Sequence, residues 1–143
     1  MKYVLLSEKF YEDFKDCPEI ERKQGRPYIE VIVEVDGIRF GVPLRSSIKH
    51  PYALLTDREN GCGLDFSKSV VIIKEEYIEK NRRPKIRENE YKYLMGKDYI
   101  VKQKLKKYIR GYKKAKENPG NPRNRDMLLY STLKYFEEYL SKL

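Results

Sequence analysis

The chain of 143 residues lacks tryptophan and contains one histidine and two cysteines. Cys17 and Cys62 are too few for a disulfide framework, and no C-x-x-C motif or histidine pair provides the pattern of a zinc site. Metal-dependent nucleases hold their cations with clustered carboxylates or histidines, and the sequence has no D-x-D pattern. We therefore expect neither a metal site nor a cofactor.

Long hydrophobic runs and the common phosphate-binding or nucleophile motifs are missing too. The apolar run near the first residue covers only Tyr3–Leu6, which is shorter than the core of a signal peptide, and no segment has transmembrane length. There is no Walker loop, no G-x-G-x-x-G and no G-x-S-x-G. We expect a cytoplasmic protein with no membrane partner.

The positive charge is concentrated in the last third of the chain. The formal net charge is +9; residues 97–143 contain 13 Lys/Arg and 5 Asp/Glu, whereas residues 1–96 contain 18 and 17. Such asymmetry favours a polyanionic partner, with nucleic acid first, an anionic membrane surface second and a merely soluble basic face as the plainer alternative. Some of the 13 tyrosines would stack on unpaired RNA bases, although most are expected to be structural.

The length predicts a single domain, residues 1–143, with one core. Alternating apolar residues in Tyr28–Val35, the turn pair Asp36-Gly37 and a return in Ile38–Leu44 predict a β-hairpin. On this pattern Glu30 and Glu34 belong to the solvated face. Further strands are expected at Tyr3–Leu6, Tyr52–Thr56 and Ser69–Ile73.

Along the chain, helices are expected between the first strand and the hairpin, and again after the last strand. Ser7 has the features of an N-cap, and Lys97–Lys116 and Asn124–Leu140 carry apolar residues at helical spacing on either side of a Pro- and Gly-containing break. The predicted class is α+β: a strongly bent antiparallel sheet or small barrel with helices packed on it.

The loop after the hairpin collects the candidate catalytic residues. Two cations, two hydroxyls and the only histidine fall within six residues: Arg45, Ser46, Ser47, Lys49 and His50. Arginine, lysine and serine bind phosphate oxygens, and histidine exchanges a proton near neutral pH. The plainer interpretation is a solvated basic loop, in which His50 only caps the loop.

If this loop acts on RNA, the simplest chemistry without a metal is transesterification. The ribose 2′-hydroxyl attacks its own 3′-phosphate and leaves a 2′,3′-cyclic phosphate and a 5′-hydroxyl. An enzyme must align the two groups, move two protons and stabilise charge on the phosphorane. Arg45 and Lys49 suit the charge, the serines suit hydrogen-bond donation, and His50 suits one proton transfer.

The order of these motifs resembles a known family, the ToxN-like endoribonuclease toxins of type III toxin–antitoxin systems, and among them the TenpN branch. The resemblance rests on short segments in a common order: Met1-Lys2-Tyr3, Ser7, Arg26-Pro27-Tyr28, Asp36-Gly37, Pro43-Leu44-Arg45-Ser46, Lys49-His50 and Tyr130-Ser131-Thr132-Leu133. Ser46 matches a serine of the ToxN groove, and Arg26 is nearest to its basic residue before the hairpin. Lys49 follows Ser46 by three residues, where ToxN has a spacing of two.

This resemblance implies a fold related to the Kid/MazF ribonucleases and metal-independent RNA cleavage. It also implies inhibition by a small repeat-derived pseudoknot RNA antitoxin in a protein–RNA hetero-oligomer, and a part in phage defence. The RNA-binding residues expected on this basis and from charge are Arg26, Tyr28, Lys102, Lys106, Arg110, Lys113, Tyr130, Ser131 and Thr132. Two rivals remain: a non-catalytic RNA-binding protein, and a membrane-surface protein with a basic amphipathic helix.

Overall fold

The central hairpin forms as the alternation predicts. The computed structural model describes residues 1–22 and 26–143, and in it strand β2 (Ile29–Val35) pairs antiparallel with β3 (Ile38–Arg45). Asp36 and Gly37 have φ angles of 49° and 82°. Two successive positive φ angles are the mark of a type I′ turn, whose twist matches that of the flanking strands.

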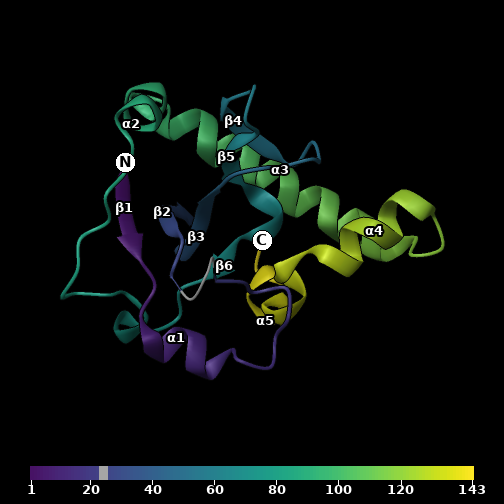
Figure 1. Cartoon of the computed structure of the whole chain (residues 1–143). Helices are drawn as coiled ribbons and strands as arrows, with labels where there is room; N and C mark the ends of the chain where they lie inside the picture. The colour runs from purple at the N-terminus through teal and green to yellow at the C-terminus, as the bar shows by residue number, and fades with distance from the viewer. Residues whose placement is uncertain (23–25) are drawn as a thin grey trace.

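A six-stranded antiparallel sheet is built around this hairpin (Figure 1). The other strands are β1 (Lys2–Leu5), β4 (Ala53–Asp57), β5 (Cys62–Asp65) and β6 (Val70–Val71). The order is β1-β2-β3-β5-β4, and β6 pairs with β3. Within the described residues no pairing joins β1 to β4, so the sheet is open. The α+β class is confirmed, and the closed small barrel is not.

Strand β3 pairs with two short strands, β5 and β6, along the edge that does not face β2. Phe40 and Gly41 pair with β6, whereas Leu44 and Arg45 pair with β5. Pro43 lies between these two pairings, where β3 has only β2 as a described neighbour. A residue without an N–H fits there, because no second ladder needs it. The end of β3 thereby turns towards β5 and brings Arg45 beside that strand.

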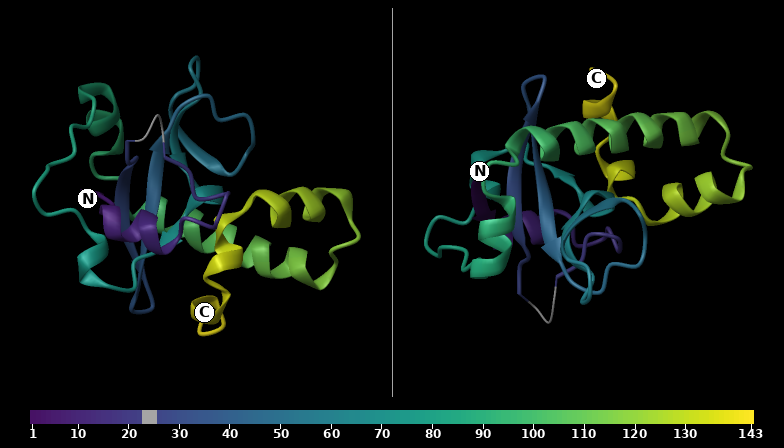
Figure 2. Two further views of the ribbon diagram at one scale, coloured as in Figure 1. Left: turned by 60° about the horizontal axis from the view of Figure 1, so that its bottom comes forward. Right: turned by 90° about the horizontal axis from the view of Figure 1, so that it is seen from above.

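Helices flank the sheet at several points. They are α1 (Glu8–Asp13), α2 (Glu88–Leu94), α3 (Asp98–Glu117), α4 (Pro122–Tyr130) and α5 (Glu137–Leu140), with short 3₁₀ turns at Phe66–Lys68, Glu75–Tyr77 and Thr132–Tyr135. The Ser7 hydroxyl caps α1 by accepting from the Phe10 N–H, as predicted. The far end of α3 and all of α4 project from the body as an antiparallel pair (Figure 2). Among the described residues, no helix is long and apolar enough to cross a membrane.

The prediction of one continuous helix from Asn124 to Leu140 is wrong, because the helix is interrupted at Ser131. The Ser131 hydroxyl accepts hydrogen bonds from the Leu133 N–H and the Tyr108 hydroxyl. The Thr132 hydroxyl donates to the carbonyls that precede β6, those of Ser67 and Ser69. Burying these two side chains against α3 and the sheet outweighs the local helical preference. The break fixes the end of α4 next to residues 67–69.

The placement of Glu30 on a solvated face is also wrong. Its side chain is only 3% exposed, and it lines a small cavity together with Tyr11 and Arg45. Its Oε1 atom has no hydrogen-bond partner among the described residues. Burial raises the pKa of Glu30 well above its usual range, against the opposing charge of Arg45. Strand β2 is therefore covered on both faces near its start, which alternation alone does not reveal.

We predict that Glu30→Gln stabilises the fold near neutral pH but not in acid. The raised pKa means that the folded state keeps a proton which the unfolded chain releases, so stability is lost as the pH rises above the ordinary glutamate range. Urea unfolding at pH 7 should show a gain in the free energy of unfolding on the order of 1 kcal/mol or more, and little gain at pH 4 or below. Glu34→Gln, at an exposed position of the same strand, is the matched control. An equal effect at both pH values would contradict the assignment.

Candidate nucleic-acid interface

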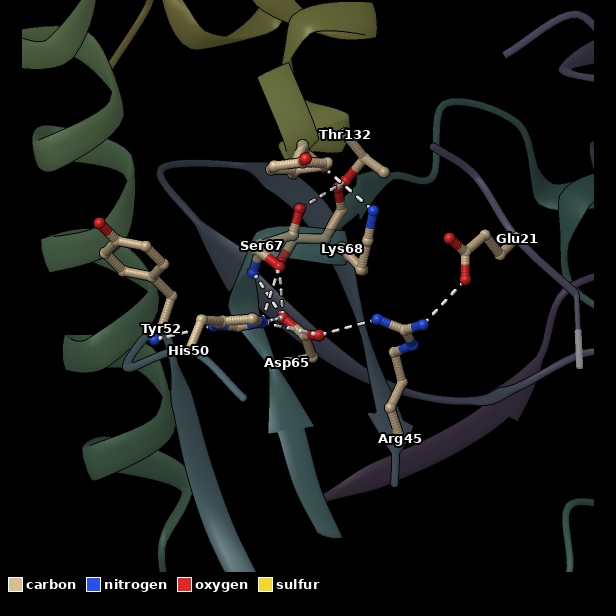
Figure 3. Close-up of polar contacts among 10 residues, drawn as sticks. Glu21, Arg45, His50, Tyr52, Asp65, Ser67, Lys68 and Thr132 are labelled. Atoms are coloured by element: carbon tan, nitrogen blue, oxygen red, sulfur yellow. Dashed lines mark hydrogen bonds and ion pairs between the residues drawn. The ribbon is translucent and has the colours of Figure 1, made fainter. Parts of the chain in front are cut away.

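A fully buried carboxylate, Asp65, organises the loop that the sequence singles out (Figure 3). Asp65 ends β5 and caps the following 3₁₀ turn. Its Oδ1 accepts from the Ser67 N–H at 3.0 Å and from the Ser67 hydroxyl at 2.6 Å. The cap fixes the first residues after β5, so Ser67 and Lys68 take defined positions beside the loop.

His50 closes this loop onto Asp65. Its Nε2 lies 3.2 Å from both Asp65 Oδ2 and the Ser67 hydroxyl, and its Nδ1 accepts from the Tyr52 N–H at 3.1 Å. Because Nδ1 accepts, the ring proton belongs on Nε2, where it faces the carboxylate. Both ring nitrogens are thus engaged within the protein. This geometry corresponds to the loop-capping role, and a direct proton transfer by His50 would need one of these bonds to open.

Arg45 approaches the same carboxylate from the end of β3. Its Nη1 donates to Asp65 Oδ2 at 3.0 Å, and its Nη2 donates to Glu21 at 2.8 Å. The guanidinium also lies over the Tyr28 ring, 5.3 Å from its centre. Burial raises the pKa of Asp65, but hydrogen bonds from His50 and Ser67 and the charge of Arg45 outweigh it, so the net pKa is lowered. Asp65 therefore remains ionised at neutral pH.

These residues form one wall of a groove of about 600 Å³, called here the central groove. Its lining residues come from the loop after β3, the turn after β5, α3 and α4: Arg45, Lys49, His50, Pro51, Tyr52, Ser67, Lys68, Tyr108, Arg123, Asp126, Met127, Tyr130 and Ser131. Four cations face one acidic side chain, and three tyrosine rings stand among them. Cations suit phosphates, and the exposed ring of Tyr130 suits an unpaired base, so the groove has the features of a single-stranded nucleic-acid site.

Lys68 is a groove residue that sequence reasoning missed. Its Nζ donates to the Tyr130 carbonyl at 3.0 Å. Burial lowers the pKa of Lys68, and the charge of Arg45 acts in the same direction, while Glu21 and Asp65 oppose it. The residue stands alone between two apolar segments, and no local motif marks it. Its place depends on the local Asp65 cap and on the break at Ser131, which is stabilised by contacts between distant residues.

The structure divides the predicted catalytic residues between two pockets. Arg45, Lys49 and His50 line the central groove. Ser46 lines a separate hollow of about 210 Å³, called here the side pocket, which Arg45 shares. Ser47 is exposed at a φ of 55°, and its N–H donates to the Asn60 carbonyl. Ser46 and Ser47 therefore do not lie with His50 in one site.

The predicted RNA-binding residues also separate. Tyr130 is 59% exposed at the groove edge, but Ser131 and Thr132 are buried and their hydroxyls are bonded within the protein. Tyr28 lies beneath the Arg45 guanidinium, and Arg26 is exposed. Ser131 and Thr132 thus support the groove rather than offer free hydroxyls to it.

On α3, the predicted cations share a stripe that differs from the stripe beside the groove. At 100° per residue, Lys102, Lys106, Arg110 and Lys113 fall on one side of the helix. An adjoining hollow of about 310 Å³, which shares Tyr52 and Tyr108 with the central groove, is lined instead by Lys104 and Lys107. The helix therefore presents two basic faces, of which only the second adjoins the groove.

Within residues 1–22 and 26–143, no group of three or more His, Cys, Asp or Glu side chains is placed to hold a metal ion. Comparisons of the chain with protein-family models, with curated proteins and with solved structures found no match.

Proposed function

We propose that this protein is an endoribonuclease toxin of a type III toxin–antitoxin system, which cleaves RNA without a metal ion in the central groove. The observation that carries the proposal is the meeting of Lys49, Lys68 and Arg45 with the exposed ring of Tyr130 and the half-buried ring of Tyr52 in one groove. RNA offers phosphates to the cations and bases to the rings. The ordered motifs shared with ToxN-like toxins support the same activity.

In the proposed reaction, the 2′-hydroxyl attacks the adjacent phosphorus and expels the 5′-oxygen of the next nucleotide. Lys49 is exposed and makes no ion pair with a described residue, so it is available to the phosphorane oxygens. Arg45 is held by Asp65 and Glu21 and presents its charge from a fixed position. Stabilising charge that develops in the transition state is the strongest contribution such residues make.

In this proposal the neutral amine of Lys68 takes the proton of the attacking 2′-hydroxyl, and water gives a proton to the departing 5′-oxygen. Lys68 is half-buried, and a lysine with a lowered pKa gives up its proton more readily than a fully exposed one, a property used by lysines that act as general bases. His50 acts through the loop: by binding Asp65 and the Tyr52 N–H, it positions Lys49 and Tyr52. His50 is therefore a positioning residue, and Ser67 supports it through the same carboxylate.

A non-catalytic RNA-binding protein is the second candidate, and one observation favours it. The imidazole, the Ser67 hydroxyl and the Arg45 guanidinium are all bonded to Asp65. A groove whose polar groups already have partners can clamp phosphates without chemistry. The following experiments separate the two candidates.

The first prediction is cleavage of RNA in excess EDTA. Purified protein incubated with mixed RNA should give 2′,3′-cyclic phosphate and 5′-hydroxyl ends, identified by end mapping. A Lys49→Ala/Lys68→Ala double variant purified in parallel controls for contaminating nuclease. Intact RNA, or cleavage that appears only when Mg²⁺ is added, would favour the passive binder.

The second prediction distinguishes charge from proton transfer. Lys49→Ala and Lys68→Ala should each lower the single-turnover cleavage rate by about 10²–10³-fold. Lys49→Arg should recover much of the rate because it keeps the charge, whereas Lys68→Arg should not, because arginine does not release its proton. Lys9→Ala, at an exposed position of α1, is the neutral control. Full activity of Lys68→Arg would show that this lysine moves no proton.

The proposed partner is a small repeat-derived RNA, bound in a protein–RNA hetero-oligomer. Helices α3 and α4 together carry most of the excess positive charge, more than one scissile phosphate requires, and the far end of α3 projects from the body with α4 (Figure 2). The antitoxin would occupy the central groove and extend along α3. The stripe that contains Lys102 and Lys106 would then contact antitoxin phosphates beyond the reach of a short substrate.

The third prediction uses the two faces of α3. Binding of the transcript of tandem repeats upstream of the gene should weaken steeply with salt. Lys102→Ala/Lys106→Ala should lower the slope of log affinity against log salt by about 1.5 and leave cleavage of a short RNA unchanged. Lys104→Ala/Lys107→Ala should impair both binding and cleavage. A lack of upstream repeats, or identical behaviour of the two double variants, would contradict the partner assignment.

A further inference from the structure

The side pocket adjoins the central groove at Arg45, which lines both. Its walls are partly apolar, formed by Tyr28, Ile29 and Leu44. Two exposed cations that precede α2, Lys85 and Arg87, also line it, together with Ser46, Cys62 and Glu90. Apolar walls with a few polar groups are the usual composition of a small-molecule site, and cations at the rim suit a phosphate.

Glu90 is the unusual member of this pocket. The residue is 7% exposed, yet its carboxyl makes no hydrogen bond or ion pair with any residue that the structure describes. Burial raises the pKa of Glu90, while the charge of Arg87 lowers it and that of Asp57 raises it further. A carboxyl group that lines a pocket and has no protein partner there is available to accept a hydrogen bond from a ligand.

We propose that the side pocket binds the nucleotide next to the scissile phosphate and selects a base that carries an exocyclic amino group. The inference rests on the proposed RNA binding in the central groove. Arg45 stands between the two hollows, so a strand whose phosphate contacts Arg45 places one neighbouring nucleotide in each. The phosphate of the selected nucleotide faces Lys85 and Arg87, and its base lies between the apolar walls and reaches Glu90.

The chemistry of Glu90 sets the preference. The charge of Arg87 beside Glu90 favours the ionised carboxylate, and in that form Glu90 accepts hydrogen bonds and donates none. Cytosine, adenine and guanine each offer an amino group to such an acceptor, whereas uracil presents a carbonyl oxygen at the position of the cytosine amino group. Two oxygens that face one another repel. Cytosine and uracil are therefore a matched pair that differs in the group Glu90 would read.

The test is titration of the full chain with cytidine 5′-monophosphate and uridine 5′-monophosphate, followed by NMR chemical shifts. Cytidine monophosphate should bind about tenfold more tightly, the value of one hydrogen bond to a charged acceptor. The shifts should include the amides of Ser46, Arg87 and Glu90. Glu90→Gln should lose the preference, because its amide can donate to the uracil oxygen, whereas Glu88→Gln, exposed on the same helix, should keep it. Arg87→Ala should weaken both nucleotides equally.

Equal affinity of the wild-type protein for the two nucleotides, a preference that survives Glu90→Gln, or shifts confined to other parts of the chain would overturn the proposal. RNA cleavage measured in parallel separates this result from the proposed function. A cytidine preference without cleavage would leave the pocket assignment standing and remove the enzyme. Cleavage with no preference among bases would leave the enzyme standing and remove the pocket assignment.

Discussion

The buried carboxylate of Asp65 is the interaction on which the groove depends. It binds His50 from the loop after β3, Arg45 from the end of β3, and Ser67 from its own turn. Two segments that are distant in sequence, residues 45–50 and residues 65–67, are thereby joined through one ion. Removal of that ion would leave Arg45 and His50 without the partner that orients them. The net lowering of the Asp65 pKa follows from these bonds, and it keeps the carboxylate charged where the groove needs it.

The hydroxyls of Ser131 and Thr132 connect this centre to the carboxyl-terminal helices. Thr132 donates to the backbone beside Ser67, and Ser131 accepts from Tyr108 of α3. These bonds end α4 beside Lys68 and hold Tyr130 at the rim of the central groove. The same contacts that break the helix therefore build the second wall. Helices α3 and α4 line one side of the central groove, and the loop that His50 fastens to Asp65 lines the other. We propose that RNA binds between them.

The sequence predicted the features that depend on neighbouring residues. The alternation around Asp36-Gly37 predicted the hairpin, and the loop composition identified Lys49 as a groove residue. The sequence did not predict the features that depend on contacts between residues far apart in the chain. Alternation could not reveal that α1 and Arg45 cover the Glu30 face of β2, and no motif marked Asp65, Lys68 or Glu90. Strand β5 was missed because Gly63 reads as a turn, although a Cβ there would lie 2.2 Å from the Leu54 carbonyl oxygen, so only glycine permits the pairing.

Chemical-shift mapping with a short 2′-O-methyl RNA tests whether RNA binds in the groove organised by Asp65. Such an RNA lacks the attacking hydroxyl and stays intact, so binding is observed apart from chemistry. If RNA binds there, we expect the largest chemical-shift changes on residues 45–52, on Ser67 and Lys68, and on Tyr130. Shifts confined to β1, α1 or α5, with these residues unchanged, would contradict it.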